Sequence, residues 1–168
     1  MAPLRQLAIS MFLLVCLAAH AGVADWVNGV KLGSKLPAYR LDLVQGQLPD
    51  KAPLTVIDFW ATWCVPCRDG IRQLNALSTA LADSGVAIVG VSDEAPELLP
   101  PFLARFPARY PIATDHDHLL NQGLKIKALP YAIIVNQAGI IVWRGQPDEL
   151  NQTTIEGLLA ANRQAPSP

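Results

Sequence analysis

The stretch LTVIDFWATWCVPC, residues 54–67, decides the fold of this chain. Its first half is a β-rich and almost continuous apolar run, which is typical of a central strand covered on both faces. Apolar residues then recur at helical spacing, at positions 67, 71, 74, 77 and 81. We therefore predict a buried strand over 54–60, a helix from near Cys64 to about Ser84, and a C-cap at Gly85.

The rest of the chain alternates between strand and helix patterns. Strands are predicted in the segment that follows Pro37, over 86–92, over 110–115, and as the two arms of a hairpin in 131–145 with Gly139 in its turn. Helices are predicted over 96–106, where the double proline at 100 and 101 favours a break or a later start, over 115–124 with Asp115 as N-cap, and over 151–162. This order favours an α/β domain in layers, and the closing hairpin makes its central sheet mixed.

Length and charge limit the functional classes. A chain of 168 residues suffices for one domain with a real core, but not comfortably for two. Its formal net charge is only −1, so charge gives no reason to expect a nucleic-acid partner. We expect a monomer.

The N-terminus has the pattern of a secretory signal peptide. Arg5 is followed by an apolar stretch over 7–19 and then by small residues around positions 19–24. We therefore expect a cleaved signal over residues 1–24 and a mature domain over 25–168. Two alternatives are an uncleaved anchor, although the apolar run is short for a membrane span, and a lipid on Cys16, although Val15 is not the small residue that usually precedes such a cysteine.

Removal of the signal would leave two cysteines, Cys64 and Cys67. A disulfide that closes so small a loop contributes little to stability, so a stapling role is not favoured. A helix that begins near Cys64 would place its thiolate against unpaired backbone N–H groups and the positive end of the helix dipole, which lowers the pKa of the thiol. Cys67 lies one turn further along and should be more buried, so we expect Cys64 to be the nucleophile and Cys67 the resolving thiol.

The segment DFWATWCVPC resembles the active-site segment of thioredoxin-fold proteins. The Val-Pro dipeptide, the exported context and the long middle section look most like the TlpA/ResA-type thiol-disulfide oxidoreductases of the bacterial periplasm. The resemblance covers most of the chain after residue 30. It implies a thioredoxin fold with an inserted βα unit in the middle, flanking helices around a mixed sheet, and no organic cofactor or metal.

The same resemblance implies dithiol–disulfide exchange with partner proteins in the periplasm, most simply as a reductant. Such a protein would serve cytochrome c maturation or the assembly of a copper site, and a membrane thiol-disulfide transporter would supply its electrons. The alternative is a disulfide oxidant or isomerase, because reduction potentials across this fold range from about −270 to about −120 mV.

Four further residues are candidates for substrate binding. In the resembled family the proline that matches Pro130 is cis and lies against the cysteine pair, and it exposes the backbone of the preceding residue, here Leu129, to an extended substrate. Trp63 is expected to pack beside the cysteines and shield them, and Pro66 lies in the first helical turn. The alternative for Pro130 is a trans proline at the start of an edge strand.

Asp58 stands in the middle of the apolar strand, six residues before Cys64. Burial should raise the pKa of its carboxyl group, which suits proton exchange with the inner thiol. The alternative is a structural aspartate with a local hydrogen-bond partner. The chain departs from the resembled branch at Gly70 and Arg72, where relatives often carry glutamate and proline. Gly70 costs about 1 kcal/mol of helix propensity, and close approach of another backbone would explain it.

One rival interpretation is a metal-binding chaperone. Cys64 and Cys67 could join His116 or His118 in a zinc or Cu(I) site. The two histidines stand two apart, so on a helix they would point in different directions.

Another rival is a peroxiredoxin-type peroxidase. That chemistry usually needs threonine or serine three residues before the reactive cysteine, where this chain has Ala61, with Thr62 following. The third rival is a redox-inactive binding module, which the intact cysteine pair disfavours.

Overall fold

The computed structural model of the chain describes residues 28–49 and 51–164, so the predicted signal over 1–24 lies outside the described residues. The helices and strands, in chain order, are β1 Asp42–Gln45, β2 Leu54–Phe59, α3 Cys67–Ala80, β3 Ala87–Ser92, α4 Leu99–Leu103, β4 Ile112–Thr114, α5 Leu119–Leu124, β5 Tyr131–Asn136, β6 Ile141–Gly145 and α6 Gln152–Gln164. Short 3-10 turns lie at Ala82–Ser84, Pro96–Leu98 and Pro147–Glu149. Among the described residues, no helix has the length and apolarity needed to cross a bilayer.

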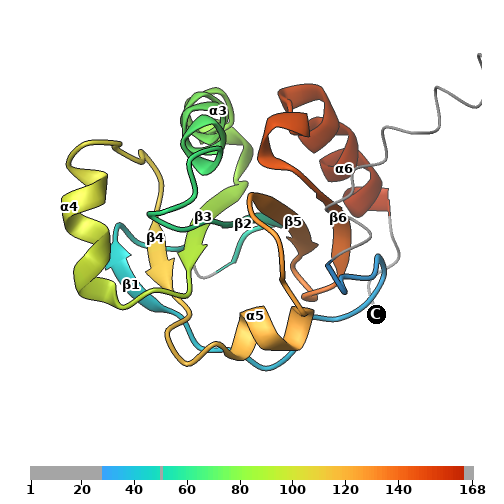
Figure 1. Cartoon of the computed structure of the whole chain (residues 1–168). Helices are drawn as coiled ribbons and strands as arrows, with labels where there is room; N and C mark the ends of the chain where they lie inside the picture. The colour runs from blue at the N-terminus through green and yellow to red at the C-terminus, as the bar shows by residue number, and fades with distance from the viewer. Residues whose placement is uncertain (1–27, 50, 165–168) are drawn as a thin grey trace, which may run out of the picture.

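The strands form one mixed sheet in the order β1-β4-β3-β2-β5-β6 (Figure 1). β2 pairs in parallel with β3, where Asp58 stands opposite Gly90, and antiparallel with β5. β5 and β6 form the predicted hairpin, and Gly139 in its turn has a φ of 75°. The predicted order of elements and the thioredoxin fold, with β4 and α5 inserted between β3 and β5, are confirmed.

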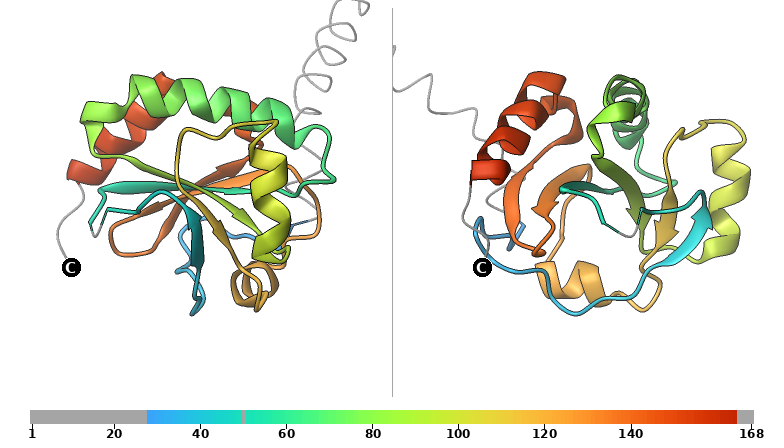
Figure 2. Two further views of the ribbon diagram at one scale, coloured as in Figure 1. Left: turned by 90° about the vertical axis from the view of Figure 1, so that its left-hand side faces the viewer. Right: turned by 180° about the vertical axis from the view of Figure 1, so that it is seen from behind.

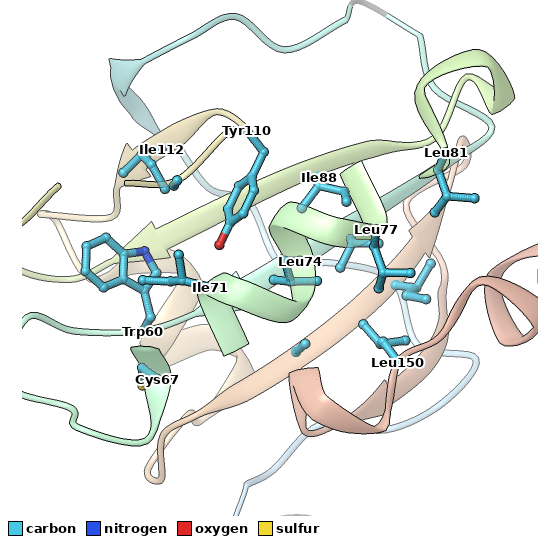
Figure 3. Close-up of a cluster of buried hydrophobic side chains, with 14 of the residues drawn as sticks. Trp60, Cys67, Ile71, Leu74, Leu77, Leu81, Ile88, Tyr110, Ile112 and Leu150 are labelled. Carbon is cyan, nitrogen blue, oxygen red and sulfur yellow. The ribbon is translucent and has the colours of Figure 1, made fainter. Parts of the chain in front are cut away.

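The sheet is covered on both faces. α3 and α6 lie over one face and α5 over the other, while α4 lies beside β4 and β1 (Figures 1 and 2). Alternate residues of β2, with Trp60 just after it, supply the two cores. Leu54, Val56 and Trp60 join the cluster under α3 and α6 (Figure 3). Ile57 and Phe59 join the cluster over α5. Burial on both faces explains why β2 is apolar almost throughout.

The first helix starts later than predicted. α3 begins at Cys67, not near Cys64, because the residues before it form tighter turns of the 3-10 type. In these turns the N–H of Cys67 donates to the carbonyl of Cys64 at 3.2 Å, and the N–H of Arg68 donates to Val65 at 3.3 Å. The helix ends at Ala80, and the predicted cap at Gly85, with a φ of 77°, closes the 3-10 turn that follows.

Prolines set the bounds of two other elements. α4 begins at Leu99 with the two prolines in its first turn, where their missing N–H groups leave no bond unmade, so the later start is confirmed. β1 begins only at Asp42, so Pro37 lies in the loop before it and not in the strand.

Asp115 caps α5 without being its N-cap residue. The helix begins at Leu119, and the N-cap position is held by His118 with a left-handed φ of 57°. The carboxylate of Asp115 nevertheless accepts the N–H groups of Leu120 at 3.1 Å and Asn121 at 2.7 Å. The predicted capping interaction is therefore present, but it reaches into the helix from three residues before the N-cap.

Gly70 faces Pro147 across a narrow gap. A Cβ atom at position 70 would meet the Pro147 ring at 3.2 and 3.3 Å, closer than nearly all real contacts of this kind. Pro147 is buried and belongs to the 3-10 turn that packs against α3. The close neighbour of Gly70 is thus a proline side chain, not another backbone as expected.

We predict that Gly70→Ala is energetically coupled to Pro147. Alanine gains about 1 kcal/mol of helix propensity over glycine, but the new methyl group would press on the proline ring. In a Pro147→Gly background, which removes both ring atoms that the new methyl group would meet, Gly70→Ala should therefore be more favourable than in the wild type by about 1 kcal/mol. Chemical denaturation of the four proteins measures this difference.

Gly157→Ala is the matched control. Gly157 lies in α6, and an added Cβ there would meet nothing within 4 Å. This substitution should stabilise both backgrounds equally, and equal effects of Gly70→Ala in both would contradict the proposed contact.

Candidate functional site

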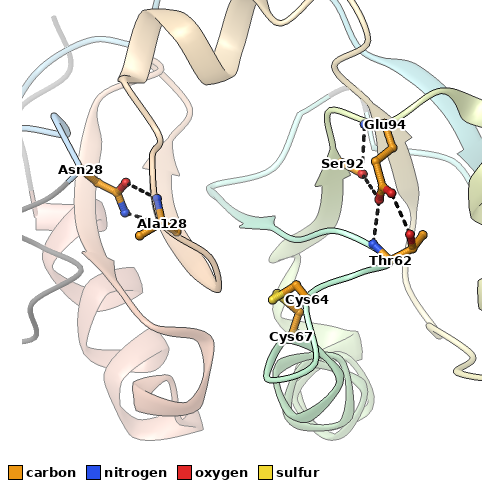
Figure 4. The surroundings of a disulfide bond; sticks show 7 residues. All are labelled: Asn28, Thr62, Cys64, Cys67, Ser92, Glu94 and Ala128. Atoms are coloured by element: carbon orange, nitrogen blue, oxygen red, sulfur yellow. Dashed lines mark hydrogen bonds between the residues drawn. A yellow bond between two sulfur atoms is a disulfide. The ribbon is translucent and has the colours of Figure 1, made fainter.

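Cys64 and Cys67 form a disulfide with an S–S distance of 1.98 Å, in the turns that lead from β2 into α3 (Figure 4). Both side chains are buried, with 3% of Cys64 and 1% of Cys67 exposed, so Cys67 is the more buried of the two by a small margin. The first N–H groups of α3 donate to carbonyls of residues 64–66. The helix dipole, rather than a set of unpaired N–H groups, is therefore the stabilisation that the fold offers to a Cys64 thiolate.

Glu94 anchors the loop that precedes the cysteines, a role that sequence analysis missed. Its carboxylate accepts the backbone N–H and the hydroxyl of Thr62, both at 2.7 Å, and the hydroxyl of Ser92 at 3.0 Å (Figure 4). Hydrogen bonds to a charged acceptor are stronger than neutral ones. Glu94 therefore ties the approach to Cys64 to the end of β3. In the sequence, Glu94 stands out only as a glutamate two residues after the end of a buried strand.

The Leu129–Pro130 peptide bond is cis, as the resemblance implied. The segment before it is held by Asn28, a buried residue near the start of the described chain. The Asn28 side-chain oxygen accepts the N–H groups of Lys127 at 2.6 Å and Ala128 at 3.1 Å, and its amide donates to the Ala128 carbonyl at 3.3 Å (Figure 4). Asn28 has no recognisable signal in the sequence because its partners lie about 100 residues away.

The side chain of Trp63 is 69% exposed, so most of it is open to solvent and only a small part can cover other residues. That Trp63 packs beside the cysteines and shields them stays a prediction. Trp63 also helps to line a cavity of about 130 Å³ that Leu129 borders. Val65 and Pro66 are exposed beside the disulfide as well. The exposed apolar groups thus surround the cysteine pair, which is the arrangement expected of a surface that receives a partner.

Asp58 is 1% exposed and lies on the α3 face of β2, in phase with Val56 and Trp60. Within the described part of the chain neither carboxyl oxygen has a hydrogen-bond partner, which goes against the alternative of a structural aspartate with a local partner. Desolvation by burial raises the pKa of Asp58 to about 8. A carboxyl group with such a pKa can bind and release a proton near neutral pH.

Tyr110 is a second buried polar group on this face that sequence analysis did not single out. Its hydroxyl points toward α3 (Figure 3), and it too has no hydrogen-bond partner among the described residues. Burial, and after it the charge of Asp58, raises the pKa of Tyr110 well above its usual value. Tyr110 and Asp58 are therefore two unpaired polar groups that interact electrostatically in the same core.

The residues behind the rival interpretations are engaged elsewhere. The Thr62 hydroxyl, which a peroxidase interpretation would call on, donates to Glu94. His116 and His118 each lie beside an aspartate, with Nδ1 at 3.3 Å from Asp117 and at 3.7 Å from Asp93. Over residues 28–49 and 51–164, no three His, Cys, Asp or Glu side chains gather into a group that could hold a metal ion.

Comparison with known proteins gives a consistent picture. The profile of the AhpC/TSA family matches residues 38–144. The thiol-disulfide oxidoreductase ResA of Geobacillus thermodenitrificans is 26% identical over 146 residues, which cover 80% of this chain and 84% of ResA. The sporulation thiol-disulfide oxidoreductase A of Bacillus subtilis is 25% identical over 132 residues, covering 71% of this chain and 80% of that protein.

Solved structures share the fold. The thioredoxin domain of a thiol-disulfide oxidoreductase from Bacteroides vulgatus superimposes with a TM-score of 0.67 at 24% identity, over 77% of this chain and 99% of that domain. StoA from Bacillus subtilis gives a TM-score of 0.52 at 24% identity, over 58% of this chain and 76% of StoA.

We predict that the buried Asp58 makes the folded protein less stable as the pH rises. Between pH 3.8, the ordinary pKa, and about 8, Asp58 is protonated when folded but ionised when unfolded, so the unfolded state binds fewer protons. Each pH unit in that window should cost up to about 1.4 kcal/mol. Asp58→Asn should abolish this slope, which urea denaturation of the oxidised protein at pH 5, 6.5 and 8 measures.

Asp83→Asn, at an exposed position in the 3-10 turn after α3, serves as the control and should keep the wild-type slope. If Asp58→Asn and the wild type lost stability in parallel as the pH rose, the buried carboxyl group would not be the cause.

Proposed function

Because this chain belongs to the AhpC/TSA family and is a thiol-disulfide oxidoreductase of the ResA/StoA type, we propose that it acts outside the cytoplasm as a reductant of disulfides in partner proteins. One observation carries the proposal: a buried cysteine pair at the start of α3 shares a core with an unpaired carboxyl group whose pKa is about 8. Thiol exchange and proton exchange are thus available in one place.

The reaction begins with the reduced pair. The Cys64 thiolate attacks one sulfur of the partner disulfide, so that a mixed disulfide forms and the partner's other sulfur leaves as a thiolate and takes up a proton. Cys67 then loses its proton to the Asp58 carboxylate and attacks the sulfur of Cys64, which releases the second partner thiolate. Two electrons have moved to the partner, and the chain is left with the Cys64–Cys67 disulfide.

Substrate would be received on the surface around the disulfide. Trp63 and Pro66 lie exposed on the cysteine side, and Leu129 and Pro130 lie on the other. A partner segment in extended conformation could pair with the backbone of Leu129, as a strand adds to a sheet edge. Asn28 and Glu94 support the proposal because each holds one of the two loops in position before the partner arrives.

The cell compartment and the partners follow from the N-terminal pattern and the relatives. The signal-like residues 1–24 favour export to the periplasm, where cleavage of the signal or its retention as an anchor would follow. A reductant there needs electrons from a membrane thiol-disulfide transporter. Its targets would be proteins of cytochrome c maturation or of copper-site assembly, and no organic cofactor is required.

The direction of electron flow is tested by a glutathione redox titration of the cysteine pair. We expect a potential toward the reducing end of the range for this fold, near about −270 mV rather than −120 mV. At each ratio of reduced to oxidised glutathione, free thiols are alkylated and the reduced and oxidised forms of the protein are separated and quantified. A value near the oxidising end would instead assign the protein as an oxidant or isomerase.

The division of labour between the cysteines is tested by trapping. Reduced Cys67→Ala should remain joined to a disulfide-bonded substrate through Cys64, because no resolving thiol is left to release it. Non-reducing electrophoresis and mass spectrometry detect the adduct and identify the partner. Cys64→Ala is the matched control and should trap far less, and the reverse result would exchange the two roles.

A further inference from the structure

A second pocket lies between α3 and the segment that leaves α4. It encloses about 260 Å³. Its lining residues are Arg68, Ile71, Arg72, Asn75, Arg105, Phe106, Pro107 and Arg109. We call it the arginine pocket, because four of these eight residues are arginines and none is acidic. The chain as a whole has a net charge of −1, so this local excess of positive charge is not a consequence of composition.

The charges of the arginine pocket are largely unmatched. Arg72 pairs with Asp69 on its own helix. No ion pair is found for Arg68, Arg105 or Arg109 within the described residues. The Nε atom of Arg68 is buried and likewise has no hydrogen-bond partner in the described part of the chain. A buried donor without a partner is costly, and a bound anion would remove that cost.

The walls of the pocket are held in position by the fold. Asn75 on α3 donates to the Pro107 carbonyl at 2.8 Å and accepts the Arg109 N–H at 2.6 Å. The Arg68 guanidinium lies 4.5 Å from the centre of the Phe106 ring, in cation–π contact. The guanidinium of Arg68 and the backbone that carries Arg109 are therefore held in place before a ligand binds, which reduces the ordering that binding requires.

The aromatic contacts continue from the pocket to the active site. Phe106 packs against Phe102 with ring centres 5.0 Å apart, and Phe102 packs against Trp60 at 5.1 Å. Trp60 directly follows β2, a few residues before Cys64. These stacked rings thus connect Phe106 in the pocket to Trp60, which precedes the loop that carries the cysteines.

The pocket also lies within reach of a substrate. Arg68 follows Cys67 in the chain, and the lining extends along α3 to Asn75, which at 1.5 Å per residue lies about 12 Å from Cys67 along the helix axis. Extended polypeptide advances by about 3.3 Å per residue. About four residues of a partner would therefore span the distance from the pocket to the disulfide.

We propose that the arginine pocket binds acidic side chains of the polypeptide whose disulfide reacts with Cys64. This inference rests on the proposed function, because it names the chemistry of the partner at that same site. Guanidinium groups recognise carboxylates through paired hydrogen bonds, and several unpaired arginines select glutamate or aspartate over neutral residues. The partner carries these acidic residues about four positions from its cysteine.

The main kinetic consequence is faster association. Charged groups that complement a partner raise the association rate by about 10-fold or more at low salt, and salt screens the effect. The preference for acidic partners should therefore be strong at low ionic strength and weak at high ionic strength.

The test uses pairs of synthetic disulfide-bonded peptides that differ only in four residues near the cysteine, all Glu in one and all Gln in the other. The reduced protein should reduce the Glu peptide about 10-fold faster than the Gln peptide at low salt. The double variant Arg105→Gln/Arg109→Gln should lose the preference. Arg105→Glu/Arg109→Glu should prefer a Lys peptide instead, which a merely structural defect would not produce.

Two controls separate the pocket from folding and from catalysis. Arg163→Glu in the last turn of α6 makes a similar change of charge at an exposed position, and should keep the preference. All variants should reduce hydroxyethyl disulfide, which is small and uncharged, at the wild-type rate. Equal rates for the Glu and Gln peptides, with normal reduction of hydroxyethyl disulfide, would overturn the arginine-pocket proposal and leave the proposed function standing.

Calorimetry provides a readout that does not depend on redox activity. A cysteine-free Glu peptide should bind the oxidised wild-type protein and fail to bind Arg105→Gln/Arg109→Gln, even if the protein reduced no disulfide at all. Citrate is the probe for a small-anion site. Saturation by citrate with the same dependence on Arg105 and Arg109, together with no binding of the Glu peptide, would replace the proposed acidic partner with a free anion.

Discussion

Burial of β2 on both of its faces is the constraint on which the rest of the structure depends. Leu54, Val56 and Trp60 fill the core under α3, while Ile57 and Phe59 fill the core over α5. The chain must leave the sheet where β2 ends, so the cysteines lie beyond the carboxyl end of this central strand and at the start of α3. The same burial removes water from Asp58 and raises the pKa of its carboxyl group. The fold and the proton chemistry therefore share one cause.

The reactive pair is kept in place by hydrogen bonds from outside its own segment. Glu94 holds the loop before Cys64, and Asn28 holds the loop before the cis proline, in both cases by accepting backbone N–H groups. Loops of this kind would otherwise sample many conformations. Because the two loops are positioned by a buried amide and a carboxylate anchored on β3, the disulfide sits between two prearranged surfaces rather than in a mobile turn.

Charge is divided between the inside and the outside of α3. The unpaired acid, Asp58, lies beneath the helix, where low polarity makes its protonation sensitive to pH near neutrality. The unpaired arginines line the pocket between α3 and the loop after α4, where we propose that a partner binds. One helix thus separates a group suited to moving a proton from groups suited to recognition, and the cysteines stand at its beginning between the two.

The sequence by itself determined most features that depend on local pattern: the order of strands and helices, the hairpin turn at Gly139, the spacing of Cys64 and Cys67, and the buried acid at Asp58. Periodicity and spacing report on a single element and its immediate neighbours, so such features can be read without a fold. Even there, the start of α3 was misplaced, because tight turns at residues 64–66 look like helix in an apolar pattern.

Only the tertiary structure decided which distant residues meet. Asn28 accepts a hydrogen bond from a residue about 100 positions away, and Glu94 accepts one from Thr62 in the loop that follows β2. The Pro147 ring leaves little room for a side chain at position 70. The exposure of Trp63 is likewise set by how the distant segments of the domain pack. The arginine pocket joins α3 and the loop that follows α4, both of which look like ordinary solvated surface in the sequence. Polar and loop residues have no periodicity, so their partners are set by packing of the whole domain and not by their neighbours in the chain.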